Sequence, residues 1–547
     1  MVSAIIEYKW LQVSEDKAFP RFKELYSHFL TILVSSFPKY LPEVSSKLIN
    51  EFDQISDDTT MHHQILANII KYVPTCVNTF PHICQKNFPH HLSSSTKELT
   101  NYIVNLIKMV QYCPDLQFNI WQLIIECSIK LDVELQNELD ELDDEEIDEV
   151  INGGDESDNE DVEIAHDSIR QHESESDNSN DSDDDDDDFI GETEYIDPVT
   201  TSTNIKKLST KLDSIINHLL ISTSNSFTID ELNNGNGVTL FNTITGLFKS
   251  HILPTHFTKS IQFIIFYISQ YQQELTDSFL VLLIDVAFNP NENLEKRLKA
   301  MQYLSSYIAR AKKISRNQVV FVVSYLTGWI NKYIIERECE IIDIELDNAQ
   351  ANLKQVGGME RFKLFYAAFQ ALLYIFCFRH KMLYKSQENF HKDSSDSEWE
   401  CELDKFFQRV IITKFNPLKF CDETVVFIFA KLATKLNVCY CYSIIEHNKR
   451  ERMLQTNGQS SLPSSVGNFR HKQEFLDLEA YFPYDPLVLP ISKKFISNAY
   501  VEWSEVNPTN DDEEDEDSTS HPDDDDDDDD DDSDSSDEEI TSEEEDD

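Results

Sequence analysis

Apolar residues recur at helical spacing along almost the whole chain. One set is Leu99, Tyr102, Ile103, Leu106 and Val110, which fall at intervals of three or four residues and therefore share one face of a helix. A single amphipathic hairpin cannot cover its own apolar face, so neighbouring helices must stack to bury it. Further sets with this spacing begin at Phe22, Ile65, Ile205, Leu294 and Phe362. The spacing predicts an all-α chain of stacked helices.

The glycine and proline usage agrees with this prediction. Glycine accounts for only 11 of 547 residues, against a usual share of about 7%. All-β folds need many glycine-rich turns and phosphate-binding loops need glycines at fixed positions, so both are disfavoured. The helices recur in pairs whose pitch fits the ~40–47 residues of helical repeats. Prolines stand at the joins between them: Pro38, Pro42, Pro74, Pro81, Pro89, Pro114, Pro254 and Pro290.

The negative charge of the chain is concentrated in two segments. Residues 132–197 contain 31 acidic residues and one base, and residues 511–547 contain 26 acidic residues and no base. Because the formal net charge is −55, the remaining body is close to neutral. A broadly basic surface for nucleic acid is therefore disfavoured, although local basic patches remain possible. Both segments lack the apolar residues that offset ordering entropy, so we expect them to be disordered.

These features predict an order of domains. The expected parts are N-terminal helical repeats over 1–131, a disordered acidic insert over 132–197, central and C-terminal helical repeats over 198–510 with mobile loops near 386–400 and 452–468, and a disordered acidic tail over 511–547.

The sequence lacks the motifs that would indicate an enzyme. It has no Gly-Lys pair, which a phosphate-binding loop requires, and no GxGxxG, GxSxG or HExxH. The adjacent pairs His62-His63 and His90-His91 would splay apart on a helix rather than chelate a metal. The pair Cys439 and Cys441 has no second pair at zinc spacing. We expect no catalytic residue, cofactor or metal.

The cysteines and the lengths of the apolar runs indicate the cellular compartment of the protein and whether it crosses a membrane. The ten cysteines form no CxxC pair, which is typical of buried thiols in a reducing, intracellular environment. The N-terminus has no signal-peptide pattern. The longest strongly apolar run, Leu364 to Phe378, is shorter than the ~20 residues that a bilayer span needs. The sequence therefore predicts a soluble protein with no membrane segment.

Several serines precede acidic residues, which is the pattern that acidophilic kinases such as casein kinase 2 prefer. A serine within any polyacidic tract matches this pattern by composition alone, so both interpretations stay open. The candidate phosphorylation sites are Ser157, Ser174, Ser182, Ser535 and Ser536.

A separate cluster, Ser93-Ser94-Ser95, precedes the apolar set that begins at Leu99. One of these hydroxyls can cap the helix, with Glu98 closing a capping box on Ser95. That role explains one serine and not three, so a contact surface is a second interpretation. Small basic groups such as Arg310 to Arg316 fit solvated helix faces or, alternatively, a weak DNA contact.

Four segments resemble a known family in the same order along the chain. The most distinctive runs from Leu294 to Ala311 (LEKRLKAMQYLSSYIARA), and the others are Gln370–His380, Asn416–Cys421 and Leu478–Pro490. They are similar to the RNA polymerase I-specific transcription initiation factor family, called transcription initiation factor IA in animals. The entry into the acidic insert, Leu135–Asp144, resembles fungal members. The aspartate-rich tail lies outside the resemblance.

The resemblance implies an all-α HEAT-type superhelix. It also implies a nuclear and nucleolar factor that binds RNA polymerase I near its stalk and keeps the enzyme initiation-competent. Such a factor delivers the polymerase to the core factor at the ribosomal DNA promoter. Free members of the family can form homodimers. Family members also use a serine patch on the N-terminal repeats at the polymerase surface, whose phosphorylation blocks docking, and Ser93, Ser94 and Ser95 lie in the part of this chain that would contribute to it.

Composition and periodicity alone leave a second class of protein open. A helical-repeat transport receptor or a histone chaperone would also combine a neutral helical body with acidic segments, which would then hold basic cargo.

Overall fold

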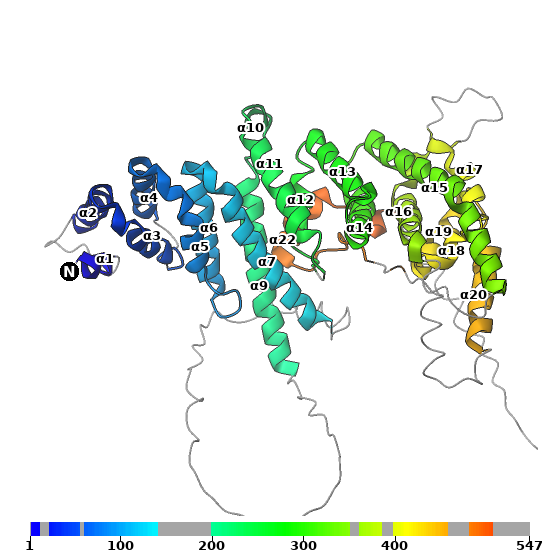
Figure 1. Ribbon diagram of the computed structural model, residues 1–547, viewed down its shortest axis with the longest axis horizontal. Coiled ribbons are helices and arrows are strands. Elements are labelled where there is room, and N and C mark those ends of the chain that lie inside the picture. Colours follow the sequence, from blue (N-terminus) through cyan, green and yellow to red (C-terminus); the bar gives the residue numbers. More distant parts are fainter. Residues whose placement is uncertain are drawn as a thin grey trace, which may run out of the picture. The chain divides into compact units, whose positions relative to one another are not determined.

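The regular structure of the chain is helical (Figure 1). The computed structural model describes residues 2–10, 21–54, 59–140, 198–256, 258–350, 360–385, 398–457, 478 and 481–506. Within these ranges there are helices and two isolated antiparallel bridges, and no strand. The all-α prediction is therefore confirmed for the described residues. The chain divides into Met1–Glu502 and Trp503–Asp547, and the described part of the second unit is helix α23, Trp503–Val506.

The described helices before the acidic insert range from 5 to 23 residues in length. They are α1 Val2–Ile6, α2 Phe22–Ser36, α3 Leu41–Asn50, α4 Thr60–Tyr72, α5 Phe80–Lys86, α6 Thr96–Tyr112 and α7 Gln117–Leu139. In this part α2 packs on α4, α3 on α5, and α6 on α7.

The helices after the insert include longer ones. They are α9 Pro198–Thr223, α10 Ile229–Asn233, α11 Asn236–Leu247, α12 Phe263–Ile268, α13 Gln273–Phe288, α14 Leu294–Arg310, α15 Arg316–Gln350, α16 Lys363–Leu383, α17 Leu403–Val410, α18 Pro417–Phe420, α19 Glu423–Lys435, α20 Tyr442–Asn457 and α22 Pro490–Ile496. Helix α9 packs on both α6 and α7, so it joins the two sides of the insert.

Prolines begin helical turns at the predicted joins. Pro38, Pro74 and Pro114 each stand at the first or second position of a 3₁₀ turn, and Pro42 and Pro81 do so in α3 and α5. This placement is favourable because the ring fixes φ and the first helical N–H groups have no partner within the helix.

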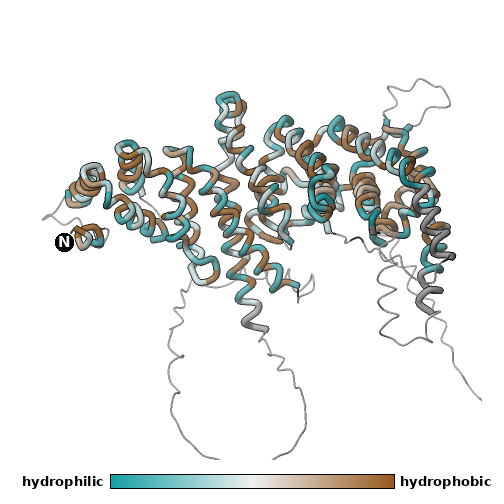
Figure 2. Tube along the Cα trace, viewed as in Figure 1, coloured by the Kyte–Doolittle hydropathy of each residue, from teal (hydrophilic) through white to brown (hydrophobic). Residues whose placement is uncertain are grey.

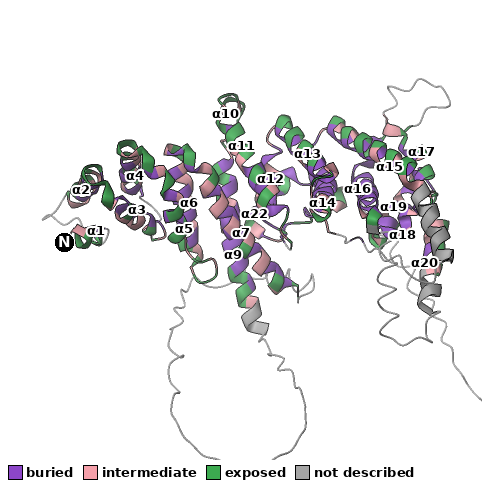
Figure 3. Cartoon of the chain, viewed as in Figure 1, coloured by how far each residue is buried: buried purple, intermediate pink, exposed green. Residues whose placement is uncertain are grey.

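The apolar sets of the sequence form the buried faces of the helices (Figures 2 and 3). In α6, Leu99, Tyr102 and Leu106 are fully buried. Leu25 of α2 differs, because its side chain is 68% exposed although it shares the predicted face. Helix α2 packs mainly on α4, so its buried face is centred on Tyr26 and Leu30 and leaves Leu25 outside.

Helix α16 is the buried centre of the part after the insert. All of its residues from Leu364 to His380 are buried, and it packs against α14, α15 and α19. Its strongly apolar sequence is thus explained by burial among other helices. None of the helices in the described ranges combines the length and the hydropathy that crossing a membrane requires.

Helix α7 continues to Leu139, eight residues into the segment expected to be the acidic insert. Leu135 and Leu139 extend its buried face, and the carboxylate of Asp132 accepts hydrogen bonds from the backbone N–H groups of Ser260 (2.8 Å) and Ile261 (2.9 Å). The acidic composition of 132–139 therefore conceals the last turns of a buried helix. Residues 141–197 and the tail 511–547 lie outside the described residues.

The two predicted loops are partly structured at their edges. Residues 452–457 belong to α20, which extends to Asn457. Near 386–400, Trp399 is buried and forms an antiparallel bridge with Tyr384. The parts of these loops at 386–397 and 458–468 are not among the described residues.

The C-terminal residues 481–502, here called the return segment, pack back onto helices near the middle of the chain. Figure 1 shows α22 beside α9 and α12. Tyr484 is fully buried, and its N–H donates to the Ser306 hydroxyl of α14 at 3.0 Å. At the end of the segment, the Val501 N–H donates to the carbonyl oxygen of Arg310 at 2.9 Å.

Candidate functional site

The predicted serine cluster lies in the turn that precedes α6, here called the serine turn (His90–Ser95). Ser95 is the N-cap of α6: its hydroxyl accepts from the Glu98 N–H at 3.2 Å, and the Glu98 carboxylate accepts from the Ser95 N–H at 2.9 Å. The predicted capping box is confirmed. Ser93 and Ser95 are exposed and Ser94 is half-buried. The hydroxyls of Ser93 and Ser94 therefore contribute nothing to the cap, and Ser93 is exposed.

The serine turn is held in place from two sides. Within the turn, the Ser94 N–H donates to the carbonyl oxygen of His90 at 3.0 Å, and His90 Nδ1 accepts from the Leu92 N–H at 3.3 Å. From outside, the ammonium of Lys211 on α9 donates to the carbonyl oxygens of His91 and Leu92. The sequence gives no signal for Lys211, because its partners lie about 120 residues earlier. The serines are thus presented on a fixed turn.

The other candidate serines are not placed. Ser157, Ser174, Ser182, Ser535 and Ser536 lie outside the described residues.

The histidine pairs behave differently from each other. His62 contacts the Glu51 carboxylate at 2.9 Å, whereas His63 contacts the Tyr112 hydroxyl at 3.0 Å, so this pair points to separate partners as predicted. His90 and His91 do not splay, because they lie in a turn and not in a helix, and their ring centroids are 4.5 Å apart. Burial lowers the pKa of His91, and the neighbouring His90 lowers it further.

Most cysteines of the described residues are buried thiols whose pKa values are raised. Burial raises the pKa of the Cys84 and Cys377 thiols to about 12, so both remain protonated. Cys439 donates to Cys441 and lowers the pKa of the Cys441 thiol, although burial acts against this. Nowhere in the described ranges do three or more histidine, cysteine or acidic side chains gather as metal ligands would.

The basic group at 310–316 is partly internal and does not form one open patch. Arg310 is buried, lies over the Phe378 ring and donates to the Val501 carbonyl oxygen at 3.2 Å. Arg316 pairs with Glu400 at 2.9 Å. Two of the four cations that suggested a DNA contact are therefore engaged in internal contacts of the protein.

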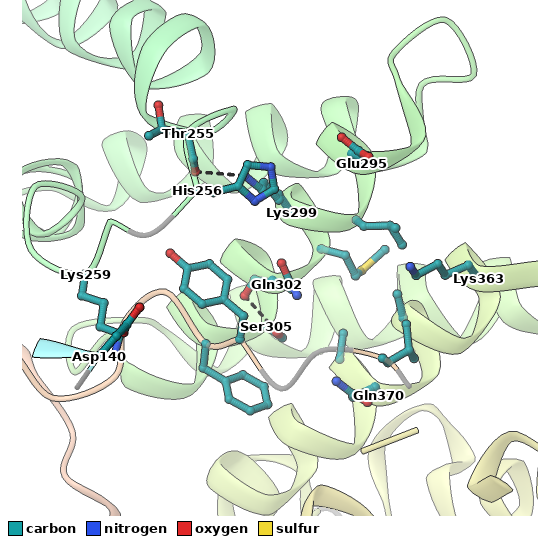
Figure 4. Close-up of a pocket in the computed structure, with 17 residues that line it drawn as sticks. Asp140, Thr255, His256, Lys259, Glu295, Lys299, Gln302, Ser305, Lys363 and Gln370 are labelled. Atoms are coloured by element: carbon teal, nitrogen blue, oxygen red, sulfur yellow. Dashed lines mark hydrogen bonds between the residues drawn. The ribbon is translucent and has the colours of Figure 1, made fainter. Parts of the chain in front are cut away.

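A cavity of about 490 Å³ lies between α14, α16 and the return segment (Figure 4). Its wall combines the cations Lys259, Lys299 and Lys363 with the carboxylates Asp140 and Glu295. Lys299 donates to the carbonyl oxygens of Pro254 (3.1 Å) and Thr255 (2.9 Å), so its ammonium ties the wall together. The Ser305 hydroxyl donates to the Gln302 carbonyl oxygen of its own helix at 3.0 Å.

The chain has clear relatives among known proteins. The profile of the family described as RNA polymerase I specific transcription initiation factor RRN3 matches residues 1–508. The RNA polymerase I-specific transcription initiation factor RRN3 of Saccharomyces cerevisiae is 43% identical, over 93% of this chain and 80% of that protein. The factor rrn3 of Schizosaccharomyces pombe is 30% identical, over 93% of this chain and 77% of that protein.

The fold is also that of a solved relative. The structure titled Crystal Structure of RNA Polymerase I Transcription Initiation Factor Rrn3 superposes with a TM-score of 0.71 and 42% sequence identity, over 92% of this chain and 86% of that chain. The family match spans both sides of the acidic insert and includes the serine turn and the return segment. The chain therefore belongs to the RRN3 family of RNA polymerase I-specific transcription initiation factors, which are not enzymes.

Proposed function

We propose that this protein binds RNA polymerase I near its stalk, keeps it initiation-competent and bridges it to the core factor at the ribosomal DNA promoter. The observation that supports this most directly is the family match over residues 1–508, together with a helical fold similar to that of a solved initiation factor. A transport receptor or histone chaperone would share the stacked helices and the acidic segments but not this sequence match. Action in the nucleus, within the nucleolus, follows from the same proposal.

The proposal includes the architecture: the stacked helices form a HEAT-type superhelix. Support comes from consecutive helix pairs that pack side by side, such as α13 on α14 and α15 on α16, and from the contacts between each pair and the next. Such arrays present long surfaces to large partners, which suits a factor that must contact both a polymerase and a promoter complex. A homodimer of the free protein through such a surface is part of the same proposal, as is a weak DNA contact.

The serine turn is the proposed contact with the polymerase. Ser93 and Ser95 are exposed, and the turn is fixed by backbone bonds, so a partner would meet a preorganised polar surface. A negative charge at such a surface must be desolvated on docking, which costs several kcal/mol when the charge is left unpaired. That loss is enough to abolish binding in the micromolar range, which corresponds to ~8 kcal/mol.

The test is binding of purified RNA polymerase I to a variant with Ser93→Asp, Ser94→Asp and Ser95→Asp. We expect the variant to lose polymerase while its melting temperature stays within a few degrees, because anions at a helix N-terminus are locally favourable by ~0.3–1 kcal/mol. The matched control replaces all three with alanine, which should bind nearly normally and lose about 1 kcal/mol of stability with the Ser95 cap. Normal binding by the aspartate variant would show that the turn is only a helix cap.

The acidic segments are proposed to be solvated tethers, and phosphorylation of Ser157, Ser174, Ser182, Ser535 or Ser536 would act within them. Deleting 155–188 together with 511–547 should leave the melting temperature of the body nearly unchanged, because the deleted residues contain few apolar side chains. A fall in helicity by circular dichroism would contradict this.

A functional assay separates the proposal from its alternative. Nuclear extract depleted of the protein should regain initiation at a ribosomal DNA promoter when the purified chain is added. Affinity purification from the same extract should recover RNA polymerase I subunits and core factor. Recovery of histones or other basic cargo without polymerase would instead favour the transport receptor or histone chaperone.

A further inference from the structure

The cavity between α14, α16 and the return segment lies at the end of α7. Asp140 directly follows Leu139, the last residue of α7, and is one of the residues that line this cavity (Figure 4). The volume of about 490 Å³ lies within the ~300–1,000 Å³ that is usual for ligand pockets. The end of α7 therefore brings the start of the acidic insert to the wall of a cavity that can hold several side chains.

The wall of this cavity carries more positive than negative charge. Three lysines line it, against two carboxylates. The ammonium of Lys299 binds two backbone carbonyl oxygens, which accept its N–H groups but do not neutralise its charge. Lys363 makes no hydrogen bond or ion pair with any residue of the described ranges, and it extends from α16 into the cavity (Figure 4). Lys259 is exposed at the other side. The charged part of the wall suits an anionic ligand.

The remainder of the wall is largely apolar. Helix α14, helix α16 and the return segment each contribute to this part, with Leu298, Met301, Ala367, Ala371 and Phe482. A purely ionic ligand would leave these side chains uncovered. A ligand that fits the whole cavity therefore needs apolar side chains as well as negative charge.

Residues 141–149 combine these two properties, and they follow Asp140 directly. Their sequence, ELDDEEIDE, contains seven acidic residues, no base and the apolar residues Leu142 and Ile147. Leu142 is two residues from Asp140, a distance of at most ~7 Å in an extended chain. A segment tethered this closely has a high effective concentration at the cavity, so even weak contacts can keep it bound.

The other acidic segment of the chain fits the cavity less well. The run Asp523–Asp532 has the charge but no apolar side chain. It is also separated from the lining residue Phe482 by 40 residues, so its tether is much longer.

We propose that this cavity is a docking site for an acidic peptide with apolar side chains, and that its occupant is residues 141–149 of the same chain. Lys259 and Lys363 face the carboxylates, and Leu142 enters the apolar part. The docked residues tie the end of α7 to α14 and α16. This proposal does not rest on polymerase binding. It also leaves the rest of the insert as a solvated tether, because the deletion described above begins at residue 155.

The test is photo-crosslinking within the full-length chain, with p-benzoylphenylalanine in place of Leu142. Crosslinks located by mass spectrometry should join this position to the residues of α14 and α16 that line the cavity. The matched control carries the same probe at Ile164, an apolar residue further along the insert, and should give about tenfold less of this product. A probe at Leu142 that crosslinks to the cavity no more than the probe at Ile164 would overturn the proposal.

Charge reversal tests the role of the lysines. Lys259→Glu combined with Lys363→Glu should lower the crosslink yield about tenfold at low salt, because attraction is replaced by repulsion. Lys431→Glu combined with Lys435→Glu is the matched control, since it reverses two exposed charges of α19 that do not line the cavity. A yield equal to that of the parent in the first variant would contradict the ionic part of the proposal. Melting temperatures of both variants check that each is folded.

A mixing experiment separates contacts within one chain from contacts between two copies. The chain with the probe at Leu142 is irradiated together with an equal amount of ¹⁵N-labelled chain that lacks the probe. We expect the crosslinked cavity peptide to be unlabelled, whereas a labelled peptide would show that the occupant comes from a second copy and would overturn the assignment. No polymerase is present, so failure of this proposal would leave the proposed function untouched.

Discussion

The return segment is anchored to α9 by a single buried carboxylate. Asp213 is 2% exposed, and its carboxylate accepts from the N–H groups of Ile491 and Ser492, both at 2.8 Å. The Ser492 hydroxyl donates to the same carboxylate at 2.5 Å. These groups form the first turn of α22, so Asp213 caps that helix from 278 residues away. We predict that Asp213→Ala selectively releases the return segment.

The size of the effect follows from these bonds. A hydrogen bond to a charged group contributes about 1.5–3 kcal/mol, and a buried N–H left without a partner costs ~1–3 kcal/mol. The three bonds share one carboxylate, so their contributions are not additive. We expect Asp213→Ala to lower the free energy of opening of the return segment by about 3–5 kcal/mol, as when one partner of a buried ion pair is removed. Asp213→Asn keeps one acceptor oxygen and should cost less, about 1–2 kcal/mol.

Hydrogen–deuterium exchange measures this opening directly, and it avoids assuming that so long a chain unfolds in one step. In Asp213→Ala, peptides from the return segment should exchange about 100- to 4,000-fold faster, since each 1.4 kcal/mol is a factor of ten. Peptides from α2 should be unchanged. The control Asp285→Ala removes an exposed aspartate of α13 and should leave exchange unchanged both in the return segment and in α2. Exchange of the return segment within threefold of the parent would refute the anchoring role of Asp213.

Two further predictions concern stability. Burial lowers the pKa of His63 to about 4, below the ~6.5 of an unfolded chain, so the unfolded state binds the proton first and stability falls between pH 6.5 and pH 4. Allowing for its partial exposure, His63→Gln should remove about 1 kcal/mol of the stability lost between pH 7 and pH 5, as measured by urea unfolding at both pH values. Gly237→Ala should lower the melting temperature, because its Cβ would lie 2.5 Å from the Ser226 carbonyl oxygen, whereas Gly246→Ala meets nothing within 4 Å and should be neutral or stabilising.

The features that could be predicted from the sequence are local. The apolar face of α6 and the capping box of Ser95 and Glu98 each depend on residues at most a few positions apart, and both occur as expected. The same holds for the prolines that begin helical turns. Spacing of three or four residues reports on one helix and on its own cap, because those contacts are set by the helical repeat itself.

The features that could not be predicted join distant segments. Asp132 lies at the start of a run that composition marks as solvated, yet it is fully buried against the backbone of Ser260 and Ile261. Composition averages over a window, so it cannot show that one acid of the window has buried donors 128 residues away. The sequence therefore predicts an acidic insert that begins at residue 132, whereas α7 extends to Leu139.

Asp132, Asp213 and Lys211 share a physical role that explains why they are tolerated in the interior. Each binds backbone groups of a segment that is far away in sequence, and each would leave an uncompensated charge if that segment packed elsewhere. Apolar contacts are non-directional, and stacked amphipathic helices could bury similar areas against several neighbours. A buried charge that needs particular N–H or carbonyl groups penalises those alternatives. In a chain of many similar helices, these charged contacts therefore specify which segments meet, including the contact between α9 and the serine turn.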